Sequence, residues 1–159
     1  NIVYQPNIFE WFSAENKVAK KDAVTVNLGI EKDGFYADVA KTFFVNQPEQ
    51  EKVYSDLENC YKQFVAEMKP GMAIGELANK MESLLLKKKL KGFLLDKNYL
   101  GHLIGFEIIE HPFLMKTTTE KLRAGMTISL LIRLINGKSE LRKQSVILID
   151  EKGGKILGN

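Results

Sequence analysis

The sequence predicts an α+β domain in which two helices cover one face of a curved, antiparallel β-sheet. Three observations support this fold class. Two β-branched segments are joined by a glycine-containing turn, two amphipathic helical segments follow them, and strand patterns return in the second half of the chain. Because strands and helices occur in separate blocks, the pattern favours α+β organisation over an alternating parallel α/β sheet.

The composition is that of one globular domain. Of the 159 residues, 45% are hydrophobic and 27% are charged, which is enough to bury a sizeable core. No apolar run reaches the roughly 20 residues of a membrane-spanning helix, so no membrane partner is expected. The single cysteine, Cys60, excludes an internal disulfide and fits a reducing compartment. The net charge of +3 is too small to predict a specific nucleic-acid partner.

The first predicted element is a β-hairpin. The segments Ala23–Ile30 and Phe35–Val45 are rich in β-branched and aromatic residues, and the sequence Glu31-Lys32-Asp33-Gly34 between them is typical of a tight turn. Residues 1–22 are interpreted as a lead-in segment, and residues 23–159 as the domain.

Two amphipathic helices are expected next. Pro48, followed by acidic residues, suits a first helical turn. Apolar residues then recur at helical spacing until Pro70-Gly71, where the first helix is expected to end. A second set at the same spacing follows and predicts a second helix. The apolar positions are Val53, Leu57, Tyr61, Phe64, Val65 and Met68 in the first, and Ile74, Leu77, Ala78, Met81, Leu84 and Leu85 in the second.

The remaining pattern is that of strands. Apolar and β-branched residues predict strands at Leu100–Ile109, Thr127–Ile135 and Leu141–Ile149, and Asn136-Gly137 predicts the turn between the last two. The chain contains no phosphate-binding, dinucleotide-binding or nucleophile-elbow motif. Isolated polar residues are therefore the candidates for chemistry, and His102, taken alone, is more often a hydrogen-bonded structural histidine than a ligand.

Four motifs resemble one family of enzymes. VNLGIEKDGFYADVAKTFF is similar to the first metal-binding hairpin of the pita-bread fold, which methionine aminopeptidases, prolidases, aminopeptidase P and creatinase share. GHLIGFEIIEHP resembles the histidine strand of that family, LRAGMTISL its Gly-Met turn, and QSVILIDEKGG its final strand. The family also places helices before the first hairpin. A lead-in of 22 residues is too short to supply them, so the resemblance implies a partial domain with uncovered apolar area on its sheet.

The resemblance also implies a degenerate metal site. The enzymes hold two divalent cations with two aspartates, one histidine and two glutamates, which offset the charge and activate a water. In this sequence the corresponding positions are Asn27, Asp38, His102, Leu131 and Lys143, and the histidine that binds substrate is replaced by Ile109. Only Asp38 and His102 could ligate a metal, and Lys143 would repel one. The expected module is not an enzyme and has no cofactor.

One branch of the fold is especially similar. LGHLIGFEIIEHPFLMK and FYADVAKTFFV resemble the N-terminal peptidase-like domain of the FACT histone chaperone large subunit, although that branch usually lacks Asp38 and His102. The resemblance implies a nuclear, chromatin-bound module that binds histones or histone-tail peptides during transcription, replication and repair. The second FACT subunit would bind regions outside this chain. The expected peptide contacts are Asp38, His102, Glu107 and Glu110, each of which could equally be an ordinary solvated strand residue.

Two alternatives remain at this point. The chain could be an active metal-dependent aminopeptidase or prolidase, which metal analysis and a peptide-cleavage assay would reveal. It could also be a non-enzymatic, RNA-associated relative of the same fold, for which RNA binding would depend steeply on salt.

Overall fold

A computed structural model describes residues 18, 20–88, 90, 94–96, 98–136 and 139–158. The lead-in segment lies almost wholly outside the described residues, as does Gly137 of the predicted Asn136-Gly137 turn. The elements in chain order are β1 (Asp22–Lys32), β2 (Phe35–Val45), α1 (Pro48–Glu67), the 3-10 helix η1 (Ile74–Glu76), α2 (Leu77–Lys87), β3 (Leu94–Leu95), β4 (Gly101–Leu103), β5 (Glu110–Phe113), β6 (Thr127–Asn136), β7 (Ser139–Ile149) and β8 (Gly154–Leu157).

The predicted hairpin is confirmed. Strands β1 and β2 pair without interruption from Asp22 opposite Val45 to Lys32 opposite Phe35. The two residues between them, Asp33 and Gly34, have φ angles of 55° and 82°. Positive φ at both central residues gives a turn whose twist matches that of the two strands. The Asp-Gly pair therefore fixes the register of the whole hairpin.

Both predicted helices are confirmed. Pro48 occupies the first turn of α1 together with Glu49 and Glu51, whose charges complement the helix dipole. Helix α1 ends at Glu67, three residues before the expected Pro70-Gly71 stop. Its apolar stripe is buried and includes Tyr61, while the matching stripe of α2 includes the fully buried Met81.

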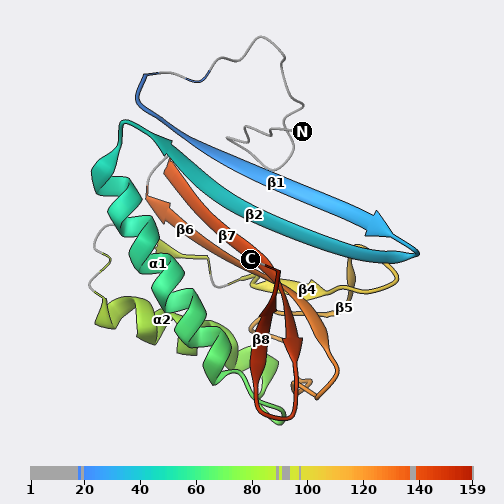
Figure 1. Cartoon of the computed structure of the whole chain (residues 1–159). Coiled ribbons are helices and arrows are strands. Elements are labelled where there is room, and N and C mark those ends of the chain that lie inside the picture. The colour runs from blue at the N-terminus through green and yellow to red at the C-terminus, as the bar shows by residue number, and fades with distance from the viewer. Residues whose placement is uncertain are drawn as a thin grey trace.

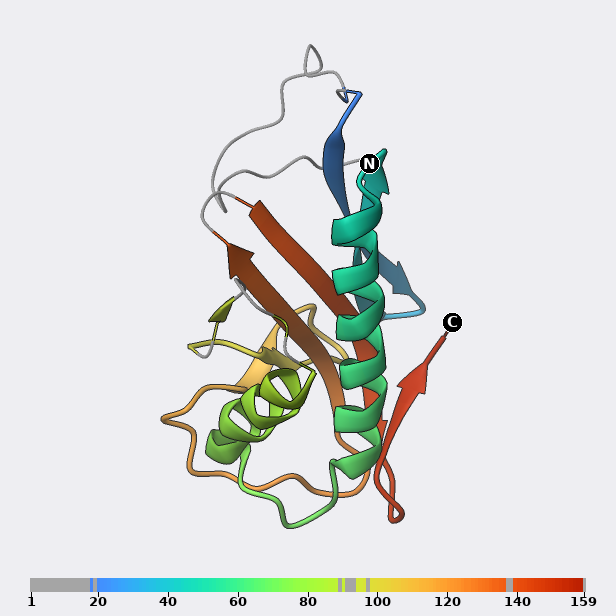
Figure 2. The same ribbon diagram turned by 90° about the vertical axis from the view of Figure 1, so that its left-hand side faces the viewer.

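The strands form one antiparallel sheet in the order β1-β2-β7-β6-β4-β5, with β3 added on β6 and β8 added on β7. Figures 1 and 2 show α1 and α2 on the same face of this sheet. The core lies between the two layers, where alternate β6 residues such as Ile128, Leu130 and Ile132 pack against the helices. This is the predicted α+β architecture. No helix in the described part of the chain is long and apolar enough to span a membrane.

One predicted strand is wrong in extent. The segment Leu100–Ile109 contains only β4, and the chain then reverses so that β5 runs back along it, with Leu103 opposite Glu110. The backbone N–H of Gly105 donates to the carbonyl of Glu107 inside this turn, with an N···O distance of 3.2 Å. The apolar residues between Leu103 and Glu110 therefore form a tight connection and not a strand.

The far half of the β1–β2 hairpin extends beyond the helices (Figure 1). Along the helix-side face of the whole hairpin, Leu28, Val39 and, nearer to α1, Phe43 are exposed by 44%, 38% and 49%. Lys41 belongs to the same face, because its Nζ lies 3.4 Å from Glu58 of α1. This is the uncovered apolar area that a partial domain predicts.

Candidate functional site

A row of side chains crosses the sheet on the face opposite the helices. Asn27 pairs with Ala40, Ala40 with Gln144, and Gln144 with Leu131. Residues directly opposite each other in antiparallel strands project from the same face. Two expected metal positions, Asn27 and Leu131, therefore lie on one face of the sheet, in the same row as Gln144.

On the same face, next to Gln144, the carboxylate of Asp38 lies close to the imidazole of His102. Gln144 donates from Nε2 to Asp38 Oδ2 and to Ser129 Oγ, both at 2.7 Å. His102, which pairs with Ser129, places its Nε2 3.7 Å from the same Asp38 oxygen. The structure thus places Asp38 and His102 side by side, together with Gln144 and Ser129, which the sequence pattern did not single out.

His102 is held in a defined orientation. Its Nδ1 lies 2.8 Å from the carbonyl oxygen of Leu103. A carbonyl only accepts, so Nδ1 carries the hydrogen and Nε2 is left facing Asp38. A metal-ligating histidine is commonly oriented in this way, but the same bond also satisfies a structural histidine. The residue is only 4% exposed.

Asp38 sits in an electrostatically unfavourable place. Burial raises the pKa of its carboxyl group, and the hydrogen bonds from Ser129 and Gln144 and the nearby His102 offset only part of that effect. Its second oxygen, Oδ1, is buried and has no hydrogen-bond partner among the described residues. The carboxylate therefore lacks the full set of partners that a buried charge requires.

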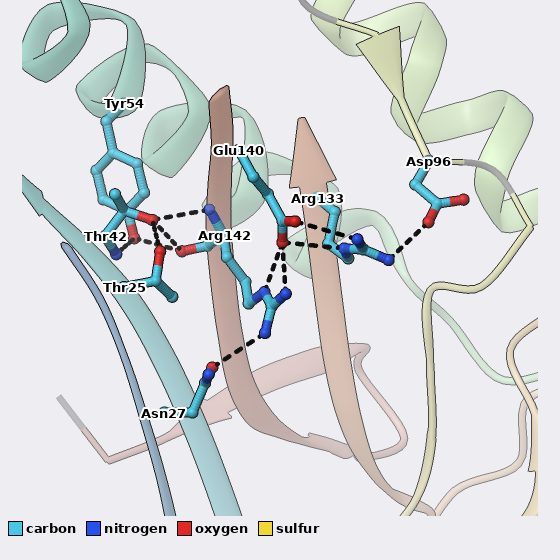
Figure 3. Close-up of polar contacts among 8 residues, drawn as sticks. All are labelled: Thr25, Asn27, Thr42, Tyr54, Asp96, Arg133, Glu140 and Arg142. Atoms are coloured by element: carbon cyan, nitrogen blue, oxygen red, sulfur yellow. Dashed lines mark hydrogen bonds and ion pairs between the residues drawn. The ribbon is translucent and has the colours of Figure 1, made fainter. Parts of the chain in front are cut away.

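Asn27 belongs to a separate charged network (Figure 3). Its Oδ1 lies 3.5 Å from Nη1 of Arg142, which also binds the carboxylate of Glu140, with Nε and Oε1 2.7 Å apart. Arg133 binds the same glutamate at 3.0 Å and Asp96 at 3.0 Å. Within this network the charges of two arginines and two carboxylates compensate each other, so it offers little net attraction to a cation.

Lys143 does not belong to the site, contrary to the sequence prediction. It pairs with Lys41 and Ile132 and projects from the helix side of the sheet. There its Nζ lies 3.7 Å from Glu58 and 5.8 Å from the centre of the Tyr61 ring. Burial lowers the pKa of its ammonium group, and Glu58 opposes that shift. Successive strand residues alternate between faces, so the residue on the site face is its neighbour Gln144.

Three further candidates lie in the connection between β4 and β5 or at its end. Ile109 is 51% exposed. The backbone N–H of Glu107 donates to Oε1 of Glu110 at 2.9 Å. The carboxylate of Glu110 is therefore held by this turn, not by the Asp38–His102 pair.

The donor set does not fit a pair of metal ions. Around Asp38 and His102 the neighbouring positions carry neutral amides, a hydroxyl and a leucine. Within the described residues no group of three or more His, Cys, Asp or Glu side chains is placed to hold a metal ion. Two cations would need several carboxylates to offset their charge. Among the described residues, Asp38 supplies the one carboxylate beside His102, and Glu140 is already paired with Arg133 and Arg142.

Comparison with known proteins identifies a family. The family model described as Metallopeptidase family M24 matches residues 5–151. Methionine aminopeptidase of Borreliella burgdorferi is 34% identical over 100 residues, which cover 62% of this chain and 39% of that protein. Xaa-Pro dipeptidase of Pyrococcus furiosus is 26% identical over 148 residues, covering 91% of this chain and 42% of the enzyme.

Solved structures show the same fold. The prolidase from Pyrococcus furiosus superimposes with a TM-score of 0.76 and 26% identity over 91% of this chain and 43% of its own. The N-terminal domain of FACT complex subunit SPT16 from chickpea, Cicer arietinum, gives a TM-score of 0.72 at 18% identity over 93% of this chain and 39% of its own. The chain therefore spans less than half the length of these relatives.

Proposed function

This chain belongs to metallopeptidase family M24, whose pita-bread fold it has in part, and we propose that it is a catalytically inactive module of a FACT-type histone chaperone. In this role it binds histones or peptides of chromatin partners during nucleosome reorganisation in transcription, replication and repair. It acts in the nucleus, and the second FACT subunit binds regions outside this chain.

One observation carries the proposal of inactivity: Asp38 is paired with the amide of Gln144 where a metal site requires further carboxylates. A unit charge and a divalent ion about 4 Å apart attract by roughly 8 kcal/mol at an effective dielectric constant near 20. Each carboxylate replaced by an amide or a leucine removes about that much attraction. A single buried carboxylate and one imidazole do not compensate two divalent ions.

The histone-binding role is supported by likeness of fold to the FACT subunit domain, which by itself shows the fold alone. A peptidase scaffold without metal charge still presents a polar sheet face on which an extended peptide can lie. Asp38 on that face and Glu110 at the start of β5 supply acidic groups, and these would attract basic histone segments.

A titration of the chain with labelled core histones tests the proposal. Wild-type protein should bind, and the pair Asp38→Asn with Glu110→Gln should weaken binding several-fold. The matched pair Glu49→Gln with Glu51→Gln removes the same charge from exposed positions on α1 and should leave binding unchanged. Wild-type binding no stronger than that of a neutral control protein would refute the proposal.

An active peptidase is the second candidate, because the two curated relatives described above carry names of enzymes. Metal analysis of the purified chain and cleavage assays on Xaa-Pro dipeptides and methionine-initiated peptides distinguish the two. Turnover that a chelator abolishes would establish the enzyme and overturn the inactive module.

A further inference from the structure

We propose that an exposed apolar rim at the tip of the β1–β2 hairpin binds an extended partner segment in which apolar and basic side chains alternate. The rim consists of Ile30, Phe35, Phe106, Ile108 and Ile109. The inference rests on the proposed function, a module that binds partner peptides, and it names the chemical class of the segment and the surface that receives it.

The rim joins two distant parts of the sequence. The rings of Phe35 and Phe106 lie with their centres 4.8 Å apart. The backbone N–H of Tyr36 donates to the carbonyl of Gly105 at 2.8 Å, which ties the β4–β5 connection to the hairpin (Figure 1). Ile108 covers Gly29, whose missing Cβ would stand 3.4 Å from Ile108 Cδ1. These contacts join the tip of the hairpin to the β4–β5 connection, and Ile30 and Ile109 lie next to them in the sequence of the two segments.

The side chains of the rim are large and exposed. Phe106 is 72% exposed, Ile30 61%, Phe35 57%, Ile109 51% and Ile108 44%. Scattered apolar residues on a surface need no explanation, but a cluster of this kind is typical of an interaction site. The hydrogen bonds within the β4–β5 connection already fix its backbone, so a partner would lose little free energy in ordering it.

The negative charge around the rim favours a basic partner. Residues 30–35 and 105–110 carry four carboxylates, on Glu31, Asp33, Glu107 and Glu110, and one ammonium, on Lys32, a formal charge of −3 in a chain whose net charge is +3. Glu31 is held in place by the N–H of Gly34 at 2.7 Å. Charge of one sign next to an apolar patch attracts partners of the opposite sign and repels like ones. Basic and apolar side chains together fit this surface, and acidic ones do not.

Three labelled peptides of equal length test the inference by fluorescence anisotropy: one alternates leucine and lysine, one serine and lysine, and one leucine and glutamate. The leucine–lysine peptide should bind at least about tenfold more tightly than either of the others. Phe106→Ser should weaken its binding by about tenfold, as expected for an aromatic anchor. Leu86→Ser is the matched control, because Leu86 on α2 is also 72% exposed and should have no effect. Thermal unfolding should show both variants folded.

The outcomes separate this inference from the proposed function. Three results would refute the proposal that the rim binds such a segment. They are equal binding of the serine–lysine peptide, no binding of any peptide, and an unchanged affinity of Phe106→Ser for the leucine–lysine peptide. If core histones bind but Phe106→Ser binds them as wild type does, the rim is refuted and the histone-binding function stands. If the leucine–lysine peptide binds at the rim and histones do not, the rim stands and the histone-binding function is refuted.

Discussion

At the scale of single residues, Asp38 is the carboxylate on which the candidate site centres. Its partners are an amide, a hydroxyl and an imidazole. Its buried Oδ1 has no hydrogen-bond partner among the described residues. The energetic consequence is a carboxyl group whose pKa burial raises, so that it ionises less readily in the folded state than in the unfolded chain.

Asp38→Asn tests this consequence through pH. Because the folded-state pKa is raised above its ordinary value of 3.8, the folded protein holds the proton more tightly than the unfolded chain does. The stability of the wild type relative to Asp38→Asn should therefore fall as pH rises from about 3.8 through the raised pKa, and stay constant above it. Urea unfolding of both proteins between about pH 3 and pH 8 measures the difference. A relative stability that rises over this window would show that Asp38 prefers to be charged.

At the scale of elements, the hydroxyl of Tyr54 on α1 forms hydrogen bonds with backbone groups of β2 and β7 where these two strands no longer pair. Strands β2 and β7 pair directly only at Ala40 opposite Gln144 and Lys41 opposite Lys143. Beyond these pairs the hydroxyl of Tyr54, from α1, accepts from the N–H of Thr42 at 3.3 Å and donates to the carbonyl of Arg142 at 3.1 Å (Figure 3). Helix α1 thereby satisfies backbone groups of both strands.

Tyr54→Phe should destabilise the fold by about 1–3 kcal/mol at little change in volume, because it leaves the N–H of Thr42 without its partner and removes one of the two donors to the carbonyl of Arg142. Burial raises the pKa of this hydroxyl well above its ordinary value, so it stays protonated and able to donate throughout the neutral range. Urea unfolding at neutral pH measures the loss. A change below about 0.5 kcal/mol would mean that water replaces the hydroxyl.

The contact between α1 and β8 depends on a glycine. The N–H of Gly154 donates to the carbonyl of Met68 at 2.8 Å, and a Cβ on Gly154 would stand 2.4 Å from the carbonyl oxygen of Val65. Gly154→Ala should therefore push β8 away from the helix and cost about 1–3 kcal/mol. Gly29→Ala is the matched strand control, since its Cβ would meet only a flexible side chain at 3.4 Å. Equal urea midpoints for the two variants would contradict the close approach.

At the scale of the whole molecule, the sequence predicts elements whose signals are local. The Asp33-Gly34 turn and the helical spacing of apolar residues determine the hairpin and both helices. Strand β8 and the break after Leu103 arise from short chain reversals that the apolar pattern does not mark: β8 turns back on β7, with Ile149 opposite Gly154, and β5 turns back on β4, with Leu103 opposite Glu110. The composition and the spacing of apolar residues do not predict which strands pair in this way.

The candidate site divides in the same way. The motif resemblance selected Asp38 and His102, whose side chains lie together in the structure, and it selected Lys143 where the structure has Gln144 on that face. The alternation of β7 contained the missing signal, because Leu141 and Ile147 are fully buried against the helices. Odd-numbered residues of this strand therefore face the core, and only an even-numbered residue can reach Asp38.

Restoring carboxylates tests the whole arrangement at once. The triple variant Asn27→Asp, Leu131→Glu, Gln144→Glu would surround Asp38 and His102 with the charge that two cations need, and it should bind about two equivalents of Mn²⁺. The wild type should bind far less. In the matched control, Lys143→Glu replaces Gln144→Glu; its new carboxylate lies beside Glu58 on the helix side, so binding should be clearly weaker than in the triple variant. Calorimetry and elemental analysis measure the stoichiometry, and circular dichroism checks the fold. Equal binding by variant and control would place the lost ligand at Lys143 after all, and two ions on the wild type would overturn the inactive module.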